Sequence, residues 1–374
     1  MPYETRLAPR APPPARAVET GDGMKRSDAE QVQAVSPGTM PFPSPDALLP
    51  GRRGVGGPGL RVADSRLSSP GWDAFRRAAP MTRAFNHLVA GVRFREKFGR
   101  WPLPPADPAA TVNDLVFARM IDPCWSPLQR AFVDKETAKA QALRRAPWLR
   151  VPETLAVVAM DDVRSVEDLY ARLLPFAGTN AIAKPANASG AATFMRDVAS
   201  PADLRDLHDL ASVDYAVVMR EMQYRGLPGK VIVEALIPAP AGRPPDDCKF
   251  HCVRGEPLVC QIDHDRFGAA WSRLFRVPDF VPMHAGDGLD RPEGHRLPAP
   301  ARLAAMIAAA RALAESFDYV RVDLYDGADG VYFGELTFTP AASLGIAPSS
   351  EGCHRVSETH RVFSRIVMDA IRRA

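Results

Sequence analysis

Two short apolar segments near the C-terminal end limit the folds open to this chain most strongly. Residues 319–325 read Tyr-Val-Arg-Val-Asp-Leu-Tyr, and residues 331–340 read Val-Tyr-Phe-Gly-Glu-Leu-Thr-Phe-Thr-Pro. Between them lies a five-residue cluster of Asp, Gly and Ala at 326–330. Val, Tyr, Phe and Thr are typical of strands, and an Asp/Gly cluster is typical of a turn. The sequence therefore predicts a β-hairpin whose loop is longer than two residues.

The two faces of this hairpin differ in chemistry. Side chains alternate along a strand, so the odd-numbered residues share a face if Tyr325 lies opposite Val331, or if the register shifts by one on each strand. That face carries a cation, two carboxylates and a hydroxyl: Arg321, Asp323, Glu335 and Thr337. The other face is apolar and predicts a core: Val320, Val322, Leu324, Leu336 and Phe338.

Carboxylates on neighbouring strands are close enough to need a cation. Cross-strand neighbours lie roughly 5 to 8 Å apart, and two carboxylates at that distance repel each other unless a cation lies between them. Oxygen ligands of this kind hold magnesium against a nucleotide. On local grounds alone, an ordinary cross-strand salt bridge to Arg321 is the alternative.

Composition limits the remaining function classes. A chain of 374 residues has room for about two domains, and 46% hydrophobic with 24% charged residues is typical of a globular protein. The net charge of +3 is small, so nucleic-acid binding has no compositional support. No apolar run approaches the roughly 18 residues that cross a bilayer, and the N-terminus lacks the apolar core of a secretion signal. We expect a cytoplasmic protein without a transmembrane segment.

The five cysteines favour reduced thiols, because an odd number in a long chain does not fit a disulfide framework. Cys248, His251 and Cys252 are close in sequence, which raises a zinc site as a hypothesis. On a strand, however, the two cysteines are about 13 Å apart, too far to share a metal at about 2.3 Å. We predict that they are small core residues.

The N-terminal part has a different character from the rest. Residues 1–80 are rich in Pro, Ala, Arg, Gly and Ser without periodicity, which predicts a disordered tail. An over-long gene start, with Met81 as the true beginning, is one alternative. Docking of the basic tail on anionic lipid is a weaker one, since the arginines are scattered. Residues 81–133 predict a short helical segment interrupted at 101–105 and at Pro123.

Further elements follow from local patterns. A helix is expected from Asp134 to about Arg145, with Asp134 as its N-cap. Residues 180–195 predict strand, loop and strand, residues 230–237 an apolar strand, and residues 246–263 a second hairpin. Helices are expected at 201–210, at 300–316 behind the first hairpin, and at 357–373.

The hairpin pattern resembles the metal-binding hairpin of ATP-grasp ligases. Its amino-acid sequence is similar to that of the TupA-like branch, which is named for teichuronopeptide biosynthesis. The resemblance runs from about residue 95 to about residue 345. It implies an α+β ATP-grasp fold in which two subdomains, 134–235 and 236–374, grip ATP between antiparallel sheets. Residues 81–133 would then be a reduced N-terminal segment.

The resemblance also implies roles for individual residues. Lys135 corresponds to the first ATP-grasp lysine and Lys184 to the second, both on the nucleotide phosphates, although a solvated helix start explains Lys135 on local grounds. The lid would contain Ser189 and Gly190. Adenine would pair with the backbone of the strand end beside Glu234: Ala235, Leu236 and Ile237. A strand-end acid paired with Lys230 or an arginine is the alternative for Glu234.

The second hairpin and the metal site complete the implied site. Asp-x-Lys-Phe at 247–250 resembles the family's Asp-Tyr-Lys-Phe with Cys248 in place of Tyr, so Asp247 would meet the ribose and Lys249 the terminal or acyl phosphate. Magnesium would be held by Asp323, Glu335 and Thr337, with Arg321 on the transferred phosphoryl group. The polar loop after the second hairpin, with His264 and Arg266, would line the substrate. A lone loop histidine is more often solvent-facing.

The activity implied is that of a carboxylate–amine ligase that uses ATP and Mg²⁺ to join a small-molecule acid to an amine through an acyl phosphate, in cell-surface polysaccharide or peptide-polymer synthesis. Two alternatives remain open at this stage. One is a kinase that phosphorylates a hydroxyl, and the other is a nucleotide-binding, non-catalytic partner of a glycosyltransferase system. The sequence names neither the substrates nor the oligomeric state.

Overall fold

The computed structural model describes residues 70–239, 245–264, 271–283, 295–345 and 356–373, all within one of the two units into which the chain divides, residues 45–374. The α-helices are α1 (Pro70–Ala78), α2 (Arg83–Phe98), α3 (Val112–Met120), α4 (Pro127–Val133), α5 (Lys135–Arg145), α6 (Val166–Leu173), α7 (Arg205–Ser212), α8 (Tyr215–Met219), α9 (Pro300–Ala314) and α10 (Glu358–Arg372). The strands are β1 (Thr154–Ala159), β2 (Ala181–Pro185), β3 (Thr193–Phe194), β4 (Lys230–Ala235), β5 (Asp247–Val253), β6 (Glu256–His264), β7 (Trp271–Arg276), β8 (Val281–Pro282), β9 (Val320–Gly327) and β10 (Gly330–Thr337). Short 3₁₀ helices are η3 (Met160–Asp162), η4 (Leu174–Phe176), η5 (Met195–Asp197), η6 (Pro201–Leu204), η7 (Met222–Tyr224) and η9 (Pro340–Ser343).

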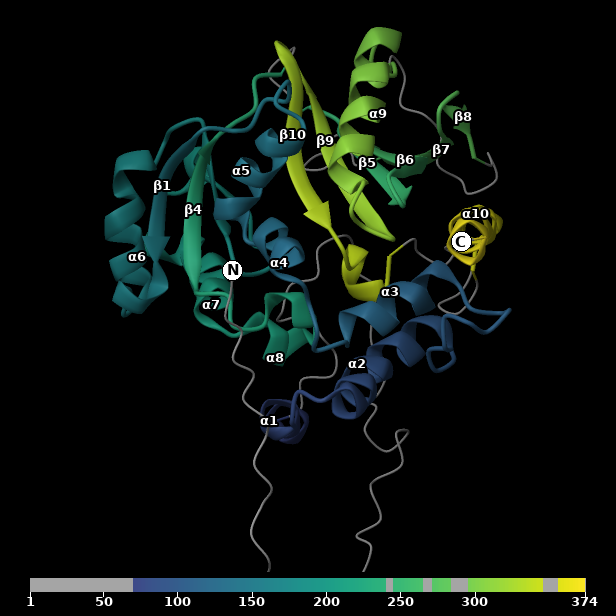
Figure 1. The fold of residues 1–374 in the computed structure, drawn as a ribbon. Coiled ribbons are helices and arrows are strands. Elements are labelled where there is room, and N and C mark those ends of the chain that lie inside the picture. Colours follow the sequence, from purple (N-terminus) through teal and green to yellow (C-terminus); the bar gives the residue numbers. More distant parts are fainter. Residues whose placement is uncertain (1–69, 240–244, 265–270, 284–294, 346–355, 374) are drawn as a thin grey trace, which may run out of the picture. The chain divides into compact units, whose positions relative to one another are not determined.

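The smaller sheet is four-stranded and antiparallel, in the order β1-β4-β2-β3. One face buries Val231 and Val233 against apolar residues of α6 and α7 (Figure 1). Because side chains alternate, the opposite face carries Lys184 and Glu234, which lie on the neighbouring strands β2 and β4. The polar face of this sheet therefore carries Lys184, the residue that the family resemblance assigns to the nucleotide phosphates.

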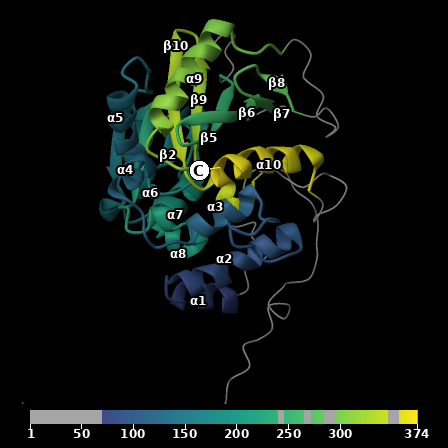
Figure 2. The ribbon, with the colours of Figure 1, turned by 45° about the vertical axis from the view of Figure 1, so that its right-hand side comes forward.

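The larger sheet is six-stranded and antiparallel, in the order β10-β9-β5-β6-β7-β8. Helix α9 covers one face, where even-numbered residues of β5, β6 and β9 are buried with Met306 and Leu313 (Figures 1 and 2). Cys248, Cys252 and Cys260 are buried on this side as free thiols, which confirms the prediction of core cysteines. The opposite face carries the charged residues of the hairpin.

Helix α5 belongs to the core of the larger sheet. Its buried Ala138 and Ala142 pack with residues of α9, β9 and β10. The helix that begins at Lys135 therefore shares its core with the larger sheet, and the subdomain boundary expected at residue 134 stays a prediction. The N-cap prediction is confirmed, because the Asp134 carboxylate accepts a hydrogen bond from the backbone N–H of Glu136 at 2.9 Å.

The N-terminal helices pack against the end of the chain and the segment after β10. Helix α3 and helix α10 share a core with Val253 and Val259 of the larger sheet. The helical segment predicted at 81–133 is present as α2, α3 and α4, which are separated at the predicted interruptions, residues 101–105 and Pro123. The prediction of a structureless tail is wrong for residues 70–80, because α1 forms there and Ala79 is buried. Residues 1–69 lie outside the described part.

Two further expectations need correction. The loop of the first hairpin is not five residues long, because β9 continues to Gly327 and β10 begins at Gly330. Helix α10 buries Phe363, Val367 and Met368 and only partly covers the residues that the sequence pattern placed in its core, Val362, Ile366 and Ile371. Among the described helices, none combines the length and apolar character that crossing a membrane requires.

Candidate active site

A β-bulge aligns the acidic residues of the hairpin. The register of β9 and β10 pairs Tyr325 with Tyr332, then shifts between Phe333 and Glu335. After the shift, Glu335 lies opposite Asp323 and Thr337 opposite Arg321. The predicted grouping of these four residues on one face is therefore confirmed, although Tyr325 does not lie opposite Val331. The bulged residue is Gly334, where an added Cβ would lie 2.7 Å from the Tyr325 ring and 2.9 Å from the carbonyl oxygen of Asp323.

Arg321 connects all members of this group. Its Nε donates to Asp323 Oδ1 at 2.7 Å and its Nη2 donates to Asp323 Oδ2 at 2.6 Å, a bidentate pair. The same Nη2 lies 3.2 Å from the Thr337 hydroxyl and 3.8 Å from Glu335 Oε1. Thr337 in turn donates to Glu335 Oε1 at 3.2 Å. Both carboxylates thus lie beside the same guanidinium group.

Negative charge is crowded at Asp323. Burial raises the pKa of Asp323 to about 7, with a further increase from Asp247 and an opposing effect from Arg321. For Arg321, burial alone would lower the pKa, but Asp323 and Glu335 outweigh burial and raise it. A buried carboxyl with a pKa near neutrality ionises fully only beside added positive charge. The site therefore favours an additional cation.

The donor set suits magnesium, which prefers oxygen ligands. The carboxylates of Asp323 and Glu335 and the hydroxyl of Thr337 supply oxygen atoms from two adjacent strands. The Asp323 side chain is 3% exposed and that of Glu335 is 43% exposed, so the group opens toward solvent on the Glu335 side. The residues present therefore fit a magnesium ion that shares its other positions with phosphate oxygens and water.

Lys249 extends the charged face onto β5 and β6. It lies opposite Asp323 in the β5–β9 register. Its ammonium group forms a close ion pair with Asp247 and a second one with Asp263 Oδ2 at 2.7 Å. Burial lowers the pKa of Lys249, but the carboxylates of Asp247, Asp323 and Asp263 outweigh it and raise the pKa. The lysine is therefore a fixed positive charge.

Two further lysines, Lys184 of β2 and Lys139 of α5, pair with Glu234 of the smaller sheet. Lys184 donates to Glu234 Oε2 at 2.7 Å, and Lys139 of α5 lies 2.5 Å from Glu234 Oε1. The alternative for Glu234, a pair with Lys230, does not form, because Lys230 pairs with Asp134 and Glu136. Burial would raise the pKa of Glu234, but Lys184 and Lys139 reverse the effect and lower it.

Lys135 stands between the two charged faces. Its ammonium group donates to the carbonyl oxygen of Ala188 at 2.6 Å. Burial lowers its pKa, while Glu335 of the larger sheet raises it and Lys184 of the smaller sheet lowers it. These two residues affect Lys135 from opposite sheets, so the structure brings Lys135, Lys184 and Glu335 into one electrostatic neighbourhood.

A cavity of about 1110 Å³ adjoins the charged face of the larger sheet and is lined by Glu335, whereas Lys135 and Lys184 are not among its lining residues. Its walls include Lys249, Asp263 and Arg321 from the larger sheet, and the exposed Ser189 and Gly190 from the loop between β2 and β3. Gly190 has a φ of +101°, a backbone conformation that glycine adopts readily. The predicted lid residues therefore line the same space as the candidate magnesium ligands Glu335 and Thr337.

Sequence reasoning missed one buried network on the cavity wall. Thr339 donates to Glu221 Oε2 at 2.6 Å, and Gln223 donates to the same oxygen at 3.0 Å. Burial raises the pKa of Glu221, against hydrogen bonds from Thr339, Gln223 and Tyr215. No local pattern connects these positions, because residues 215–223 and Thr339 are more than a hundred positions apart in the chain.

A left-handed turn forms another part of that wall. Ala341, Ala342 and Ser343 have φ values of +48°, +49° and +67°, a conformation that costs roughly 1–2 kcal/mol per non-glycine residue. The amide of Asn113 holds the turn by donating to the carbonyl oxygens of Ser343 and Gly345 at 2.7 and 2.9 Å. The Ser343 hydroxyl and the Asn113 side-chain oxygen line the cavity, are buried, and have no hydrogen-bond partner among the described residues.

The remaining predictions divide into three cases. His264 does not lie with the cavity residues, because alternation along β6 turns it to the α9 side and its Nδ1 lies 2.6 Å from Asp246. Arg266 lies outside the described residues. At the predicted adenine strand, the N–H groups of Ala235 and Leu236 donate to carbonyl oxygens of Glu153 and Asn180 at 3.0 and 3.1 Å, and Ile237 is half-buried.

Weak likenesses to solved structures accompany this geometry. ATP-grasp ligase PsnB complexed with minimal precursor is 16% identical, with 66% of this chain and 62% of that chain covered and a TM-score of 0.33. D-alanine–D-alanine ligase from Bacillus anthracis is 15% identical over 65% of this chain and 66% of that chain, with a TM-score of 0.32. D-cycloserine synthetase DcsG is 18% identical over 64% and 72%, with a TM-score of 0.34. The chain spans about three fifths of the length of PsnB.

A sequence family provides the firmer assignment. No curated protein matches the chain in sequence. The family described as TupA-like ATPgrasp matches residues 166–349, a range that contains Lys184, Glu234, Lys249 and the whole β9–β10 hairpin. Through residues 166–349, the chain therefore belongs to the TupA-like ATPgrasp family.

Proposed function

We propose that this protein is an ATP-dependent carboxylate–amine ligase. The observation that carries the proposal is the convergence of Arg321, Asp323 and Glu335 with Lys249 on one sheet, next to Lys135 and Lys184 on the other side. Phosphoryl transfer needs positioning and neutralisation of charge more than covalent chemistry from the protein. Three lysines, one arginine and a cation site supply both.

In the first step, an oxygen of the substrate carboxylate attacks the γ-phosphorus of ATP. The bond from that phosphorus to the bridging oxygen breaks, ADP leaves, and an acyl phosphate forms. Lys135 and Lys184 are assigned to the phosphates that remain on ADP, whereas Lys249 and Arg321 stabilise charge on the transferred phosphoryl group. Magnesium held by Asp323, Glu335 and Thr337 would neutralise phosphate oxygens.

In the second step, the nitrogen of an amine attacks the acyl carbon. The bond to the phosphate oxygen breaks, inorganic phosphate leaves, and the amine loses one proton to give an amide. The reacting acid is assigned to the cavity beyond Arg321, where the Ser343 hydroxyl and the Asn113 oxygen offer buried polar groups that lack a protein partner. Ser189 and Gly190 at the cavity wall would exclude water from the acyl phosphate.

The test incubates the protein with ATP, Mg²⁺, pooled amino acids and pooled sugar acids. It measures the release of ADP and then the masses of the products. Asp323→Asn and Glu335→Gln should each lower turnover at least about 100-fold, because each removes a carboxylate that would hold the magnesium ion against the transferring phosphoryl group. Asp326→Asn is the matched control, since Asp326 lies on the same strand but pairs with Arg302 at 3.0 Å.

Three outcomes would contradict the proposal. Turnover of Asp323→Asn within a few-fold of the unaltered protein would remove the metal assignment. A stable phosphate ester in place of an amide would identify a kinase, and ATP binding without ADP release in every mixture would identify a non-catalytic nucleotide-binding protein.

A further inference from the structure

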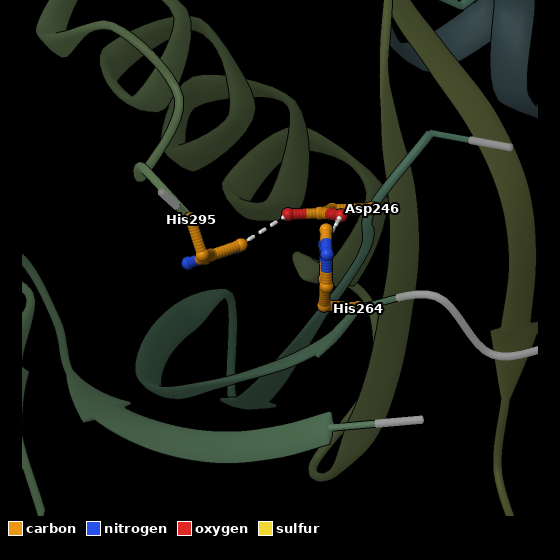
Figure 3. Close-up of side chains that lie close together, drawn as sticks. All are labelled: Asp246, His264 and His295. Carbon is orange, nitrogen blue, oxygen red and sulfur yellow. Dashed lines mark hydrogen bonds and ion pairs between the residues drawn. The ribbon is translucent and has the colours of Figure 1, made fainter. Parts of the chain in front are cut away.

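Two histidines and an aspartate converge at the end of the larger sheet, outside the cavity described above. His264 Nδ1 lies 2.6 Å from Asp246 Oδ1, and His295 Nε2 lies 2.7 Å from Asp246 Oδ2. The three ligand atoms all lie within 4.8 Å of one another. Figure 3 shows both imidazole rings directed at the two oxygens of one carboxyl group.

The position of this cluster follows from strand alternation. Asp247 pairs with Asp263 across β5 and β6, so the next pair along the two strands, Asp246 and His264, is turned to the opposite face. That is the face covered by α9. His295 joins them from the segment that leads into α9. The cluster and the magnesium ligands therefore lie on opposite faces of the same sheet.

The site is built rather than incidental. The side chains of Asp246, His264 and His295 are 17%, 13% and 2% exposed, and the His295 ring packs 4.9 Å from the ring of Trp271. Their sequence separations are large, so three different segments must be held together to bring the ligand atoms to one point. The pair of His208 and Asp209 differs from this cluster. The Asp209 side chain is 68% exposed, and no third ligand group joins the pair among the described residues.

We propose that Asp246, His264 and His295 bind a zinc ion. Two imidazole nitrogens and one carboxylate oxygen are the ligands that zinc accepts, whereas magnesium prefers oxygen alone. Zinc bonds of about 2.0–2.2 Å place ligand atoms about 3.4 Å apart, so the aspartate must move away from each nitrogen by about 0.7 Å. Each neutral imidazole then carries its proton on the nitrogen that faces away from the metal.

The ion would fasten the end of β5 to the end of β6 and to the segment before α9. Asp247 and Asp263, the two partners of Lys249, are the immediate neighbours of the zinc ligands Asp246 and His264. A zinc ion on the α9 side would therefore fix the positions of Asp247 and Asp263, and with them the two ion pairs of Lys249 on the opposite face of the sheet. The zinc assignment itself does not depend on the proposed ligase function.

The experiment uses the full chain without a histidine tag, stripped with EDTA. Titration with ZnCl₂, followed by calorimetry and by metal analysis after dialysis, should show one zinc ion per chain with a Kd below about 1 μM. Cobalt in place of zinc should give the intense visible absorption of a four-coordinate ion. His264→Gln, His295→Gln and Asp246→Asn should each weaken zinc binding at least about 100-fold, more than the loss of an outer partner costs.

His208→Gln is the matched control and should bind zinc as the unaltered chain does. Circular dichroism of each metal-stripped variant establishes that it is folded, and Asp246→Asn retains an oxygen that accepts from histidine. Absence of micromolar zinc binding by the unaltered chain would overturn the inference, as would zinc binding of normal affinity in Asp246→Asn and both histidine variants. If the unaltered chain bound no zinc but still released ADP, the zinc assignment would fail while the proposed function stood, so the two failures are distinguishable.

Discussion

Glu234 shows what a single residue contributes and how far its role could be predicted. The sequence pattern identified Glu234 and Lys184, which the structure joins at 2.7 Å. It did not identify Lys139, the second partner, because only the tertiary position of α5 brings Lys139 to β4. Local patterns indicate which charges exist, whereas the packing of helices decides which charges meet.

Glu221 gives a residue-scale prediction about pH. Burial raises its pKa, and the charged or titratable groups near it include Arg93 of α2, Tyr215 of α8 and Tyr224 of η7. A carboxyl whose pKa is raised on folding contributes stability that is present at low pH and lost as the pH rises through the folded value. Glu221→Gln removes this loss, so its melting temperature should increase relative to that of the unaltered protein between pH 5 and pH 8.

The pH dependence separates charge from hydrogen bonding. The amide oxygen can still accept from Thr339, and any hydrogen bond lost from Tyr215 would shift the melting temperature by the same amount at every pH. Differential scanning fluorimetry of both proteins across the range provides the measurement. A difference in melting temperature that stays constant or falls with pH would contradict a raised pKa at Glu221.

At the scale of elements, the faces of strands were predictable and their irregularities were not. Period-two alternation predicted that Arg321, Asp323 and Glu335 share a face, and they do. The same alternation, applied to β6, would have turned His264 away from Asp263, but the sequence pattern placed His264 in the polar loop after the hairpin. The bulge at Gly334 depends on cross-strand register, which the sequence alone left open.

Gly334 carries the element-scale prediction. A methyl group at this position would lie 2.7 Å from the Tyr325 ring and 2.9 Å from the Asp323 carbonyl oxygen. Because the backbone oxygen cannot move without shifting β9, Gly334→Ala should destabilise the protein by about 1–3 kcal/mol and displace Glu335 from Asp323. We expect ADP release to fall at least about 10-fold, measured at a temperature where the variant is folded.

Gly71→Ala is the control for this substitution, since an added methyl group there meets no atom within 4 Å. It should leave ADP release and the urea unfolding midpoint unchanged. If Gly334→Ala also matches the unaltered protein in both measurements, the bulge does not position Glu335.

At the scale of the whole molecule, the N-terminal helices are tied to the centre of the chain. Arg220, fully buried after α8, donates through Nη1 to the Pro80 carbonyl at 3.3 Å and to Asn86 at 3.1 Å, and through Nη2 to the Ala79 carbonyl at 3.0 Å. Its Nη2 also donates to the carbonyl of Arg76. Composition predicted a disordered tail up to residue 80. It did not reveal α1, because the stability of so short a helix comes from tertiary contacts rather than from local sequence.

A truncation series tests this connection. A chain that begins at Met81 lacks the carbonyls of Arg76, Ala79 and Pro80 and leaves a buried guanidinium with fewer acceptors. Because hydrogen bonds to a charged group contribute about 1.5–3 kcal/mol each, its free energy of unfolding should be lower by at least about 3 kcal/mol. A chain that begins at Pro70 keeps these acceptors and should unfold at nearly the same urea concentration as the full chain. In the chain that begins at Met81, Arg220→Met should restore part of the loss, because it removes the uncompensated charge. Equal unfolding midpoints for the Met81 and Pro70 chains would show that residues 70–80 contribute nothing to the fold.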